Sequence, residues 1–305
     1  MSDMVKLSVS PHIHSGKSTG GIMRDVIISL LPATVAGALI FGMRSLLVVA
    51  LCVSCCVAFE ALFNLITKKY QTVGDLSAVV TGLLLALNLP ANIPLWQCVV
   101  GCLFAIVVVK CIFGGIGSNL VNPAITARVF MLVAFGSMAV AAFPVDATSG
   151  ATPLSSETMP SLIDLFLGNH GGAIGETCVA ALLLGGIYLL VRRVITWHIP
   201  VVFIATVYVF ALALNGFDPT VALCHVMSGG LVIGAFFMAT DYVTSPATAK
   251  GKVIFALGAG VVTCLIRYFG SYPEGVSFAI LFMNILTPYI SRVSAKRVFG
   301  VGGNK

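Results

Sequence analysis

Ten apolar runs, each bounded by charged residues, glycine, proline or asparagine, occupy most of this 305-residue chain. Hydrophobic residues make up 58% of the sequence and charged residues only 9%, whereas a soluble domain carries about 25% charged residues. Because a membrane-spanning helix needs about 20 predominantly apolar residues, the pattern predicts an all-α, polytopic membrane protein. The ten predicted spans cover residues 25–42, 46–66, 76–89, 95–113, 122–143, 176–191, 199–214, 222–240, 253–270 and 276–291.

The basic residues indicate how these spans are oriented, because cytoplasmic loops of membrane proteins are enriched in lysine and arginine. With a cytoplasmic N-terminus, fifteen of the seventeen basic residues fall on the inner side, and only Arg44 and Arg267 fall outside. The fifteen are Lys6, Lys17, Arg24, Lys68, Lys69, Lys110, Arg128, Arg192, Arg193, Lys250, Lys252, Arg292, Lys296, Arg297 and Lys305. This distribution predicts that both termini are cytoplasmic and that a long polar loop faces outward.

The position of that loop divides the chain into two sets of five spans, and an odd number of spans in each half predicts halves of opposite orientation. Three residues around the third span recur at the same spacing around the eighth, in agreement with an internal repeat; the pairs are Gly82 and Gly234, Asn88 and Thr240, and Pro94 and Pro246. The spacing of Asn119 and Pro123 likewise recurs in Asn284 and Pro288. The predicted segments are an N-terminal segment (1–24), a first five-helix half (25–143), the outer loop (144–175), a second five-helix half (176–291) and a C-terminal tail (292–305).

Several classes of function find no support in the sequence. The nine cysteines all lie in or at the ends of apolar runs without paired zinc or ferredoxin spacing, which predicts packing rather than a metal site. The net charge of +6 is accounted for by the inner-side basic residues, so no nucleic-acid partner is expected. The chain has no complete phosphate-binding loop, no zinc-protease helix motif and no serine-hydrolase elbow. A self-contained active site is therefore not predicted.

Glu60 is the one carboxylate well inside a predicted span. A carboxylate within a membrane is costly and is by default a candidate for function, so Glu60 is a candidate for the path of a translocated ion. A position near the interface or a pairing with a basic residue would equally explain it.

The outer loop contains a short run of small and polar residues, from Asp146 to Pro153. Gly150 tolerates nearly any backbone conformation, and Pro153 disfavours helix at Thr152. The Thr152 hydroxyl is therefore expected to be accessible, although such residues are common in any loop.

The run Asp146-x-x-Ser149-Gly150-Ala151-Thr152 resembles the recognition sequence of flavin transferases, which attach FMN through its phosphate to the hydroxyl of the final threonine. Further stretches extend the resemblance over nearly the whole chain; they are Ser10-Pro11-His12, Met23-Arg24, Leu89-Pro90 through Gln97, Phe113-Gly114-Gly115 through Asn122-Pro123-Ala124, and Tyr272-Pro273-Glu274-Gly275. Together they resemble the RnfD/NqrB family, which contains membrane subunits of the Rnf electron-transport complex and of the sodium-pumping NADH:quinone reductase. About 24 residues precede the first span, and the quinone-reductase subunits carry a longer extension there, so the Rnf type is favoured.

This resemblance implies a flavin-carrying redox subunit of an inner-membrane complex that passes electrons between ferredoxin and NAD+ and moves Na+ or H+. The implied fold is two inverted five-helix repeats similar to urea transporters, and the implied cofactors are covalent FMN on Thr152 and a noncovalent riboflavin. The implied partners are an outward-facing flavin subunit, other membrane subunits, cytoplasmic iron–sulfur and NAD-binding subunits, a flavin transferase and membrane lipid. Glu274 and Gly275, on the same predicted outer face as Thr152, are candidates for lining the FMN site, and a turn before a helix would also explain them.

Two other functions remain open on the residues alone. A stand-alone channel or secondary transporter would also have inverted halves and an intramembrane carboxylate such as Glu60. The quinone-reductase subunit would share the attachment motif. Covalent flavin on Thr152 separates the first alternative from a redox subunit, and quinone-dependent activity of the intact complex would favour the second.

Overall fold

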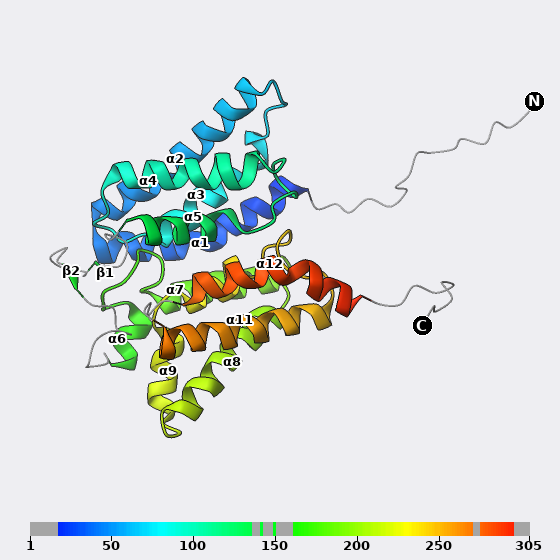
Figure 1. Cartoon of the computed structure of the whole chain (residues 1–305). Helices are drawn as coiled ribbons and strands as arrows, with labels where there is room; N and C mark the ends of the chain where they lie inside the picture. The colour runs from blue at the N-terminus through cyan, green and yellow to red at the C-terminus, as the bar shows by residue number, and fades with distance from the viewer. Residues whose placement is uncertain (1–17, 136–140, 143–148, 151–160, 271–274, 296–305) are drawn as a thin grey trace, which may run out of the picture.

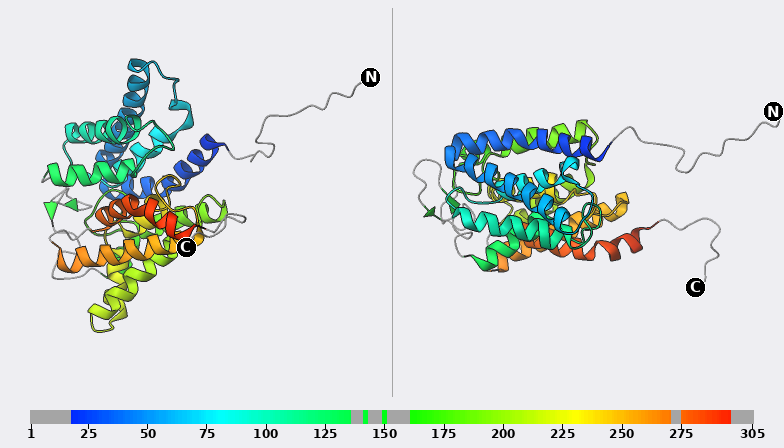
Figure 2. Two further views of the ribbon diagram at one scale, coloured as in Figure 1. Left: turned by 45° about the vertical axis from the view of Figure 1, so that its right-hand side comes forward. Right: turned by 90° about the horizontal axis from the view of Figure 1, so that it is seen from above.

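The computed structural model of the chain describes residues 18–135, 141–142, 149–150, 161–270 and 275–295. Over these residues the protein is a bundle of helices with one two-stranded β-ladder (Figure 1). The start of α1 and the end of α12 lie at one end of the bundle, and the ladder lies at the other (Figure 1 and the right-hand view of Figure 2). In Figure 1, α6 lies at the same end as the ladder.

The first half of the chain forms five helical segments and a short 3₁₀ turn. The segments are α1 (Thr19–Phe41), α2 (Met43–Ile66), the turn η1 (Val73–Asp75), α3 (Ser77–Leu87), α4 (Leu95–Leu103) with its π-helical continuation η2 (Phe104–Cys111), and α5 (Pro123–Ala134). Asn122 caps α5, because its Oδ1 accepts from the amides of Ala124 and Ile125 while Pro123 occupies the first helical position.

The second half begins after a ladder in which β1 (Ala141–Ala142) pairs antiparallel with β2 (Ser149–Gly150). α6 (Leu162–Leu167) follows within the predicted outer loop. The helices of the second half are α7 (Val179–Val191), α8 (His198–Leu214), α9 (Pro219–Met227), α10 (Leu231–Ile233) with the π-helical η4 (Gly234–Met238), α11 (Ala249–Phe269) and α12 (Val276–Ser294). The start of α9 resembles that of α5, because the Asp218 side chain caps the helix and Pro219 occupies its first position.

Each of the ten predicted apolar runs contains a helix or a bent helix pair. Four of the described helices, α1, α2, α11 and α12, are long and apolar enough to cross a bilayer, and the pair formed by α9 and α10–η4, bent by 65°, is a fifth candidate. The shorter helices run for 10–17 residues. The structure therefore supports a multi-pass membrane protein, while the count of ten spans stays a prediction.

Two span boundaries differ from the prediction. The fifth run was expected to reach residue 143, but α5 ends at Ala134 and Phe135 is already extended. The eighth run breaks after Met227, where Gly229 adopts a φ of 67°. That conformation is open to glycine at little cost. Hydrophobicity alone therefore overstated the length of α5 and the continuity of the eighth run.

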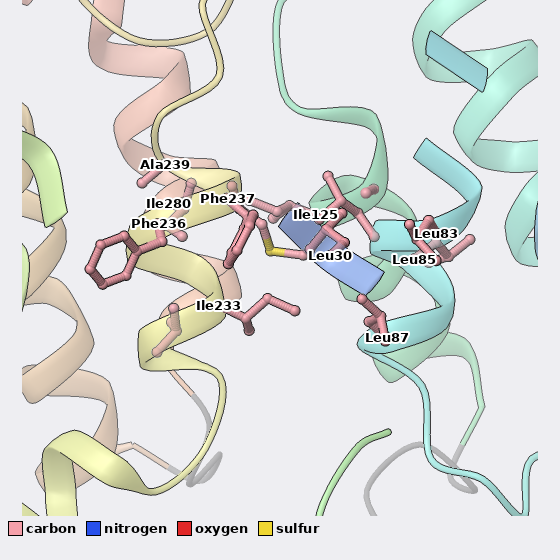
Figure 3. Packing of buried hydrophobic residues seen from close by; sticks show 14 of the residues in the cluster. Leu30, Leu83, Leu85, Leu87, Ile125, Ile233, Phe236, Phe237, Ala239 and Ile280 are labelled. Carbon is pink, nitrogen blue, oxygen red and sulfur yellow. The ribbon is translucent and has the colours of Figure 1, made fainter. Parts of the chain in front are cut away.

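The two halves meet along matching elements. The first helix of one half, α1, packs against the first of the other, α7, and α5 packs against α12. Leu83, Leu85 and Leu87 on α3 face Ile233, Phe236 and Phe237 on α10–η4 across a core that also holds Leu30 and Ile125 (Figure 3). Gly82 and Gly234, which recur at equal spacing in the sequence, thus lie on helices that face each other.

Glycine permits the close approach of helices at several positions, of which Gly82 and Gly185 are two. A Cβ on Gly82 would lie 2.8 Å from the Cα of Val53, and a Cβ on Gly185 would overlap the carbonyl oxygen of Ser29. The first contact joins α3 to α2 and the second joins α7 to α1. Small residues at helix crossings let backbones approach each other in membrane proteins.

Candidate functional sites

The expected flavin-attachment run lies mostly outside the described residues. Asp146, Ala151 and Thr152 fall there, while Ser149 and Gly150 form β2. The pairing of Gly150 with Ala141 holds this part of the loop beside the end of the first half. The ladder lies at the opposite end of the bundle from the start of α1 (Figure 1).

The second predicted part of the FMN site is only partly described. Glu274 lies outside the described residues, and Gly275 is the buried residue that precedes α12. A Cβ on Gly275 would lie 2.8 Å from the Cβ of Ile266 and 3.0 Å from the carbonyl oxygen of Thr263. A packing role against α11 therefore accounts for this glycine, and its contribution to a flavin site stays a prediction.

Glu60 is buried and paired. Its Oε2 lies 2.8 Å from the Nζ of Lys110, and each side chain is 2% exposed. Its Oε1 accepts a 2.6 Å hydrogen bond from Thr72, which in turn accepts one of 3.0 Å from Asn64. Because an ion pair offsets part of the cost of burying a carboxylate, Lys110 compensates the burial of Glu60.

Lys110 extends this arrangement to α3. Its Nζ donates a second hydrogen bond, of 2.6 Å, to Ser77 Oγ, and Ser77 donates one of 2.6 Å to Asp75 Oδ1. The count of basic residues placed Lys110 on the inner side, and the structure shows that its side chain is buried at the end of η2. Glu60 and Lys110 lie in two different predicted apolar runs. An acid and a base placed in this way are a sequence signal that could have suggested the ion pair.

A cavity lies among α1, α3, η2, α7 and η4, and we call it the central cavity. Its lining includes the aromatic side chains of Phe236 and Phe237, the amides of Asn119 and Asn122, and the carboxyl of Asp241; Ser77 and Lys110 also line it. Asn119 Oδ1 is buried and has no hydrogen-bond partner among the described residues. Burial raises the pKa of Asp241, which lies just beyond η4, and hydrogen bonds from Thr244 and Val243 oppose that rise.

A second pocket, the α2–η2 pocket, lies on the other side of the ion pair. Glu60, Asn64 and Thr72 line it together with Cys111, the exposed Lys68 and Lys69, and Gly114 and Gly115. Gly114 and Gly115 adopt φ values of 117° and 91°, so the glycine-rich stretch after η2 is irregular.

A second buried polar cluster joins the two halves. Arg128 in α5 donates a 2.8 Å hydrogen bond to Asn88 Oδ1 and lies 3.7 Å from Glu176 Oε2. Asn122 Nδ2 donates to the carbonyl oxygen of Met238 in η4, at 3.2 Å. Arg128, which the count of basic residues placed on the inner side, is buried, and Asn88 and Glu176 compensate its burial. Sequence reasoning did not identify Glu176.

Glu176 belongs to a buried, non-helical segment, residues 170–177, that packs against the C-terminal end of α3. The amides of Ile174 and Gly175 donate to the carbonyl oxygens of Leu89 and Leu87, at 3.0 and 2.7 Å. Carbonyls at a helix C-terminus lack partners within the helix, so this segment satisfies them. Within it, burial lowers the pKa of His170, whose ring nitrogens lie 3.0 and 3.2 Å from the carbonyl oxygens of Gly171 and Thr177.

The cysteines lie inside the bundle. All nine are free thiols and either buried or half-buried, which agrees with the packing role predicted for them. Cys52 and Cys56 on α2 face Cys98 and Cys102 on α4, and the Cys102 thiol lies 3.5 Å from the Cys52 carbonyl oxygen. Among the described residues no group of three or more His, Cys, Asp or Glu side chains is arranged to hold a metal ion.

Comparison with known proteins identifies relatives of similar length. Residues 6–300 match the NQR2, RnfD, RnfE family. The chain is 49% identical over 306 residues to the D subunit of the Na(+)-translocating ferredoxin:NAD(+) oxidoreductase complex of Acetobacterium woodii, covering 97% of this chain and 95% of the relative. It is 40% identical over 319 residues to the D subunit of the proton-translocating ferredoxin:NAD(+) oxidoreductase complex of Clostridium ljungdahlii, covering 96% of each.

A third relative, the D subunit of the ion-translocating oxidoreductase complex of Stutzerimonas stutzeri, is 38% identical over 327 residues, which cover 93% of this chain and 92% of the relative. The similarity thus runs across both halves and the loop between them. With nearly its whole length matched, the chain belongs to the NQR2, RnfD, RnfE family.

Proposed function

We propose that this chain is the flavin-carrying membrane subunit of an ion-translocating ferredoxin:NAD+ oxidoreductase complex of the Rnf type, with FMN bound covalently to Thr152. The observation that carries the proposal is the complete Asp146-x-x-Ser149-Gly150-Ala151-Thr152 run in a chain of this family. Bound FMN would supply one- and two-electron chemistry, while the protein positions the cofactor and sets its surroundings. A covalent link keeps the redox centre from dissociating.

The fold offers a suitable base for this attachment. Ser149 and Gly150 form β2, which pairs with β1, and α6 follows further along the outer loop. The ladder and α6 lie at the same end of the bundle (Figure 1). The pairing of α1 with α7 and of α5 with α12 supports two five-helix halves related by a two-fold axis, with opposite orientations.

The proposed orientation places both termini in the cytoplasm and the attachment loop outside. Lys110 and Arg128 are buried and no longer contribute to the charge count. Thirteen of the other fifteen basic residues still fall on the inner side in this orientation. Arg267, one of the two exceptions, donates to the carbonyl oxygens of His225 and Ser228 at the end of α9. The proposed partners are an outward-facing flavin subunit, other membrane subunits, cytoplasmic iron–sulfur and NAD-binding subunits, and a flavin transferase.

The central cavity is our candidate site for a noncovalent riboflavin. Phe236 and Phe237 offer aromatic surface for a flat ring, and the unpartnered Oδ1 of Asn119 can accept from an N–H or hydroxyl of a ligand. Glu60 remains the candidate for handling the translocated Na+ or H+. Normal ion transport by a correctly assembled Glu60→Gln complex would remove it from that role.

The covalent flavin is tested by producing the protein together with its flavin transferase. We expect flavin fluorescence on a denaturing gel and an FMN adduct on the peptide from Asp146 to Leu154 by mass spectrometry. Thr152→Ala should abolish both signals, and Thr148→Ala should retain them. An unmodified Thr152 in protein made with an active transferase would contradict the proposal and favour a stand-alone channel or secondary transporter. A quinone-dependent activity of the intact complex would instead favour the quinone-reductase relative.

A further inference from the structure

Lys110 lies at the boundary between two cavities. Its ammonium lines the central cavity together with Ser77, whereas its partner Glu60 lines the α2–η2 pocket. The single contact of 2.8 Å between them is therefore part of the partition between the two spaces. The Lys110 ammonium therefore contacts the Glu60 carboxylate of one pocket and the Ser77 hydroxyl of the other.

The carboxylate of Glu60 resembles an occupied cation site. Its two oxygens accept from Lys110 and Thr72, so it has one positive neighbour and one hydroxyl neighbour. A buried carboxylate without a counter-charge is strongly unfavourable. If the ammonium moved away, Glu60 would have to take up a proton or a metal cation, and Thr72 and Asn64 provide oxygen atoms beside it.

The surroundings allow the ammonium to move. Lysine carries its charge at the end of a flexible four-carbon chain, and the central cavity adjoins the Lys110 side chain. Other charged or titratable groups also surround the pair. Asp75 is reached through Ser77, and Cys56 interacts electrostatically with Lys110. Cys111, Lys68, Lys69 and Tyr70 line the α2–η2 pocket, and Asp241 and Tyr242 line the central cavity. Thr72, Lys68 and Lys69 are exposed, so the α2–η2 pocket is the side from which a cation can enter.

We infer that Lys110 is a tethered cation that occupies a monovalent-cation site at Glu60 and leaves it when negative charge enters the central cavity. This inference rests on the proposed function, because the negative charge is an electron received by the carrier bound there. The charges balance: one electron enters the central cavity, the ammonium shifts toward it, and one Na+ or H+ from the α2–η2 pocket neutralises Glu60. Lys110 is a positioning residue in this scheme.

The test measures the state of Glu60 directly, with dicyclohexylcarbodiimide, which modifies protonated buried carboxyl groups, followed by mass spectrometry of the Glu60 peptide. In wild-type protein the ion pair should keep labelling low. In Lys110→Met the carboxyl of Glu60 has lost its buried counter-charge, so it should bind a proton, and labelling should rise about tenfold or more. This readout needs no bound flavin.

Sodium and protons give different results in this assay. Protection of the Lys110→Met protein by NaCl, but not by choline chloride, would assign a sodium site, and labelling that depends on pH alone would assign a proton site. Lys69→Met is the matched control, because Lys69 lines the same pocket but lies over the Phe63 ring, 5.8 Å from its centroid. It should label as weakly as wild type. A folded Lys110→Met protein that stays unlabelled at every pH, with or without sodium, would overturn the inference.

A measurement on the unaltered complex covers the case in which Lys110→Met does not fold. Reduction of the wild-type complex with dithionite should increase labelling of Glu60, or make it sensitive to sodium, relative to the oxidised complex. Glu60→Gln should remove the signal at this peptide. If the complex contains flavin and its labelling does not change on reduction, the inference is wrong. If it contains no flavin, the proposed function fails, while the prediction for Lys110→Met still stands.

Discussion

The guanidinium of Arg128 in α5 donates a 2.8 Å hydrogen bond to the side-chain oxygen of Asn88, the residue that ends α3. Asn88 Nδ2 bonds in turn to the Leu84 carbonyl oxygen and lies 3.8 Å from the Met238 sulfur in η4. Arg128 also faces Glu176, in the segment that precedes α7. One buried cation therefore fixes the end of a short helix against elements of both halves.

The first prediction concerns Arg128→Met. Removing the cation leaves Glu176 buried without a counter-charge and Asn88 without its donor, and breaking a buried pair in this way costs about 3–5 kcal/mol. The free energy of unfolding in detergent should fall by that amount. Arg192→Met is the control, because Arg192 pairs with Asp25 at 3.3 Å but its side chain is 57% exposed. Such pairs contribute about 0–1 kcal/mol. Equal, small losses in both variants would show that the buried cluster is not structural.

The second prediction concerns the crossing of α1 and α7. Alanine normally stabilises a helix interior relative to glycine, by about 1 kcal/mol. At Gly185 the added Cβ would overlap the Ser29 carbonyl oxygen, so Gly185→Ala should instead lower the free energy of unfolding, by about 1–3 kcal/mol. Gly74→Ala is the matched control, since a Cβ there meets nothing within 4 Å. Thermal unfolding of both variants measures the difference, and a stabilised Gly185→Ala protein would contradict the packing described.

The helices were predictable because their signals are local. The apolar runs locate every long helix, and Asn122-Pro123 marks the start of α5 through capping. The end of α5 was not predictable in this way. The apolar run continues beyond Ala134, so hydrophobicity contains no signal for the extended conformation of Phe135.

The buried charges were not predictable because their partners are remote. Lys110 lies fifty positions after Glu60, and Arg128 pairs with Asn88 from another helix and with Glu176 from a loop. A count of basic residues treats each of these as a surface charge, since nothing near it in the sequence offers compensation. Asp146, Ala151, Thr152 and Glu274 lie outside the described residues, so the attachment site still rests on sequence.

The third prediction is a pH dependence of stability from His170. Burial lowers the pKa of this imidazole in the folded protein, whereas an unfolded histidine titrates near about 6.5. The unfolded chain then binds more protons in that range, so His170 should destabilise the fold as pH falls from about 6.5 toward the folded pKa. The wild-type melting temperature should therefore fall more steeply below neutral pH than that of His170→Asn. Parallel profiles for the two proteins would rule out a contribution from this residue.

The fourth prediction separates the two proposed flavins. Asn119 Oδ1 is buried in the central cavity without a hydrogen-bond partner among the described residues, and a donor on a ligand would satisfy it. Replacing a group that hydrogen-bonds a ligand costs about 0.5–1.5 kcal/mol, so Asn119→Leu should weaken retention of noncovalent flavin about threefold to tenfold.

The measurement is the flavin released by acid precipitation, compared with the covalent fluorescence that stays on the gel. Covalent fluorescence should not change, because the proposed bond to Thr152 does not depend on the central cavity. Asn215→Leu is the control, because Asn215 contacts Tyr268 and does not line the central cavity. Equal release from Asn119→Leu and wild type would place the noncovalent flavin elsewhere, and parallel loss of the covalent signal would indicate a general failure to fold.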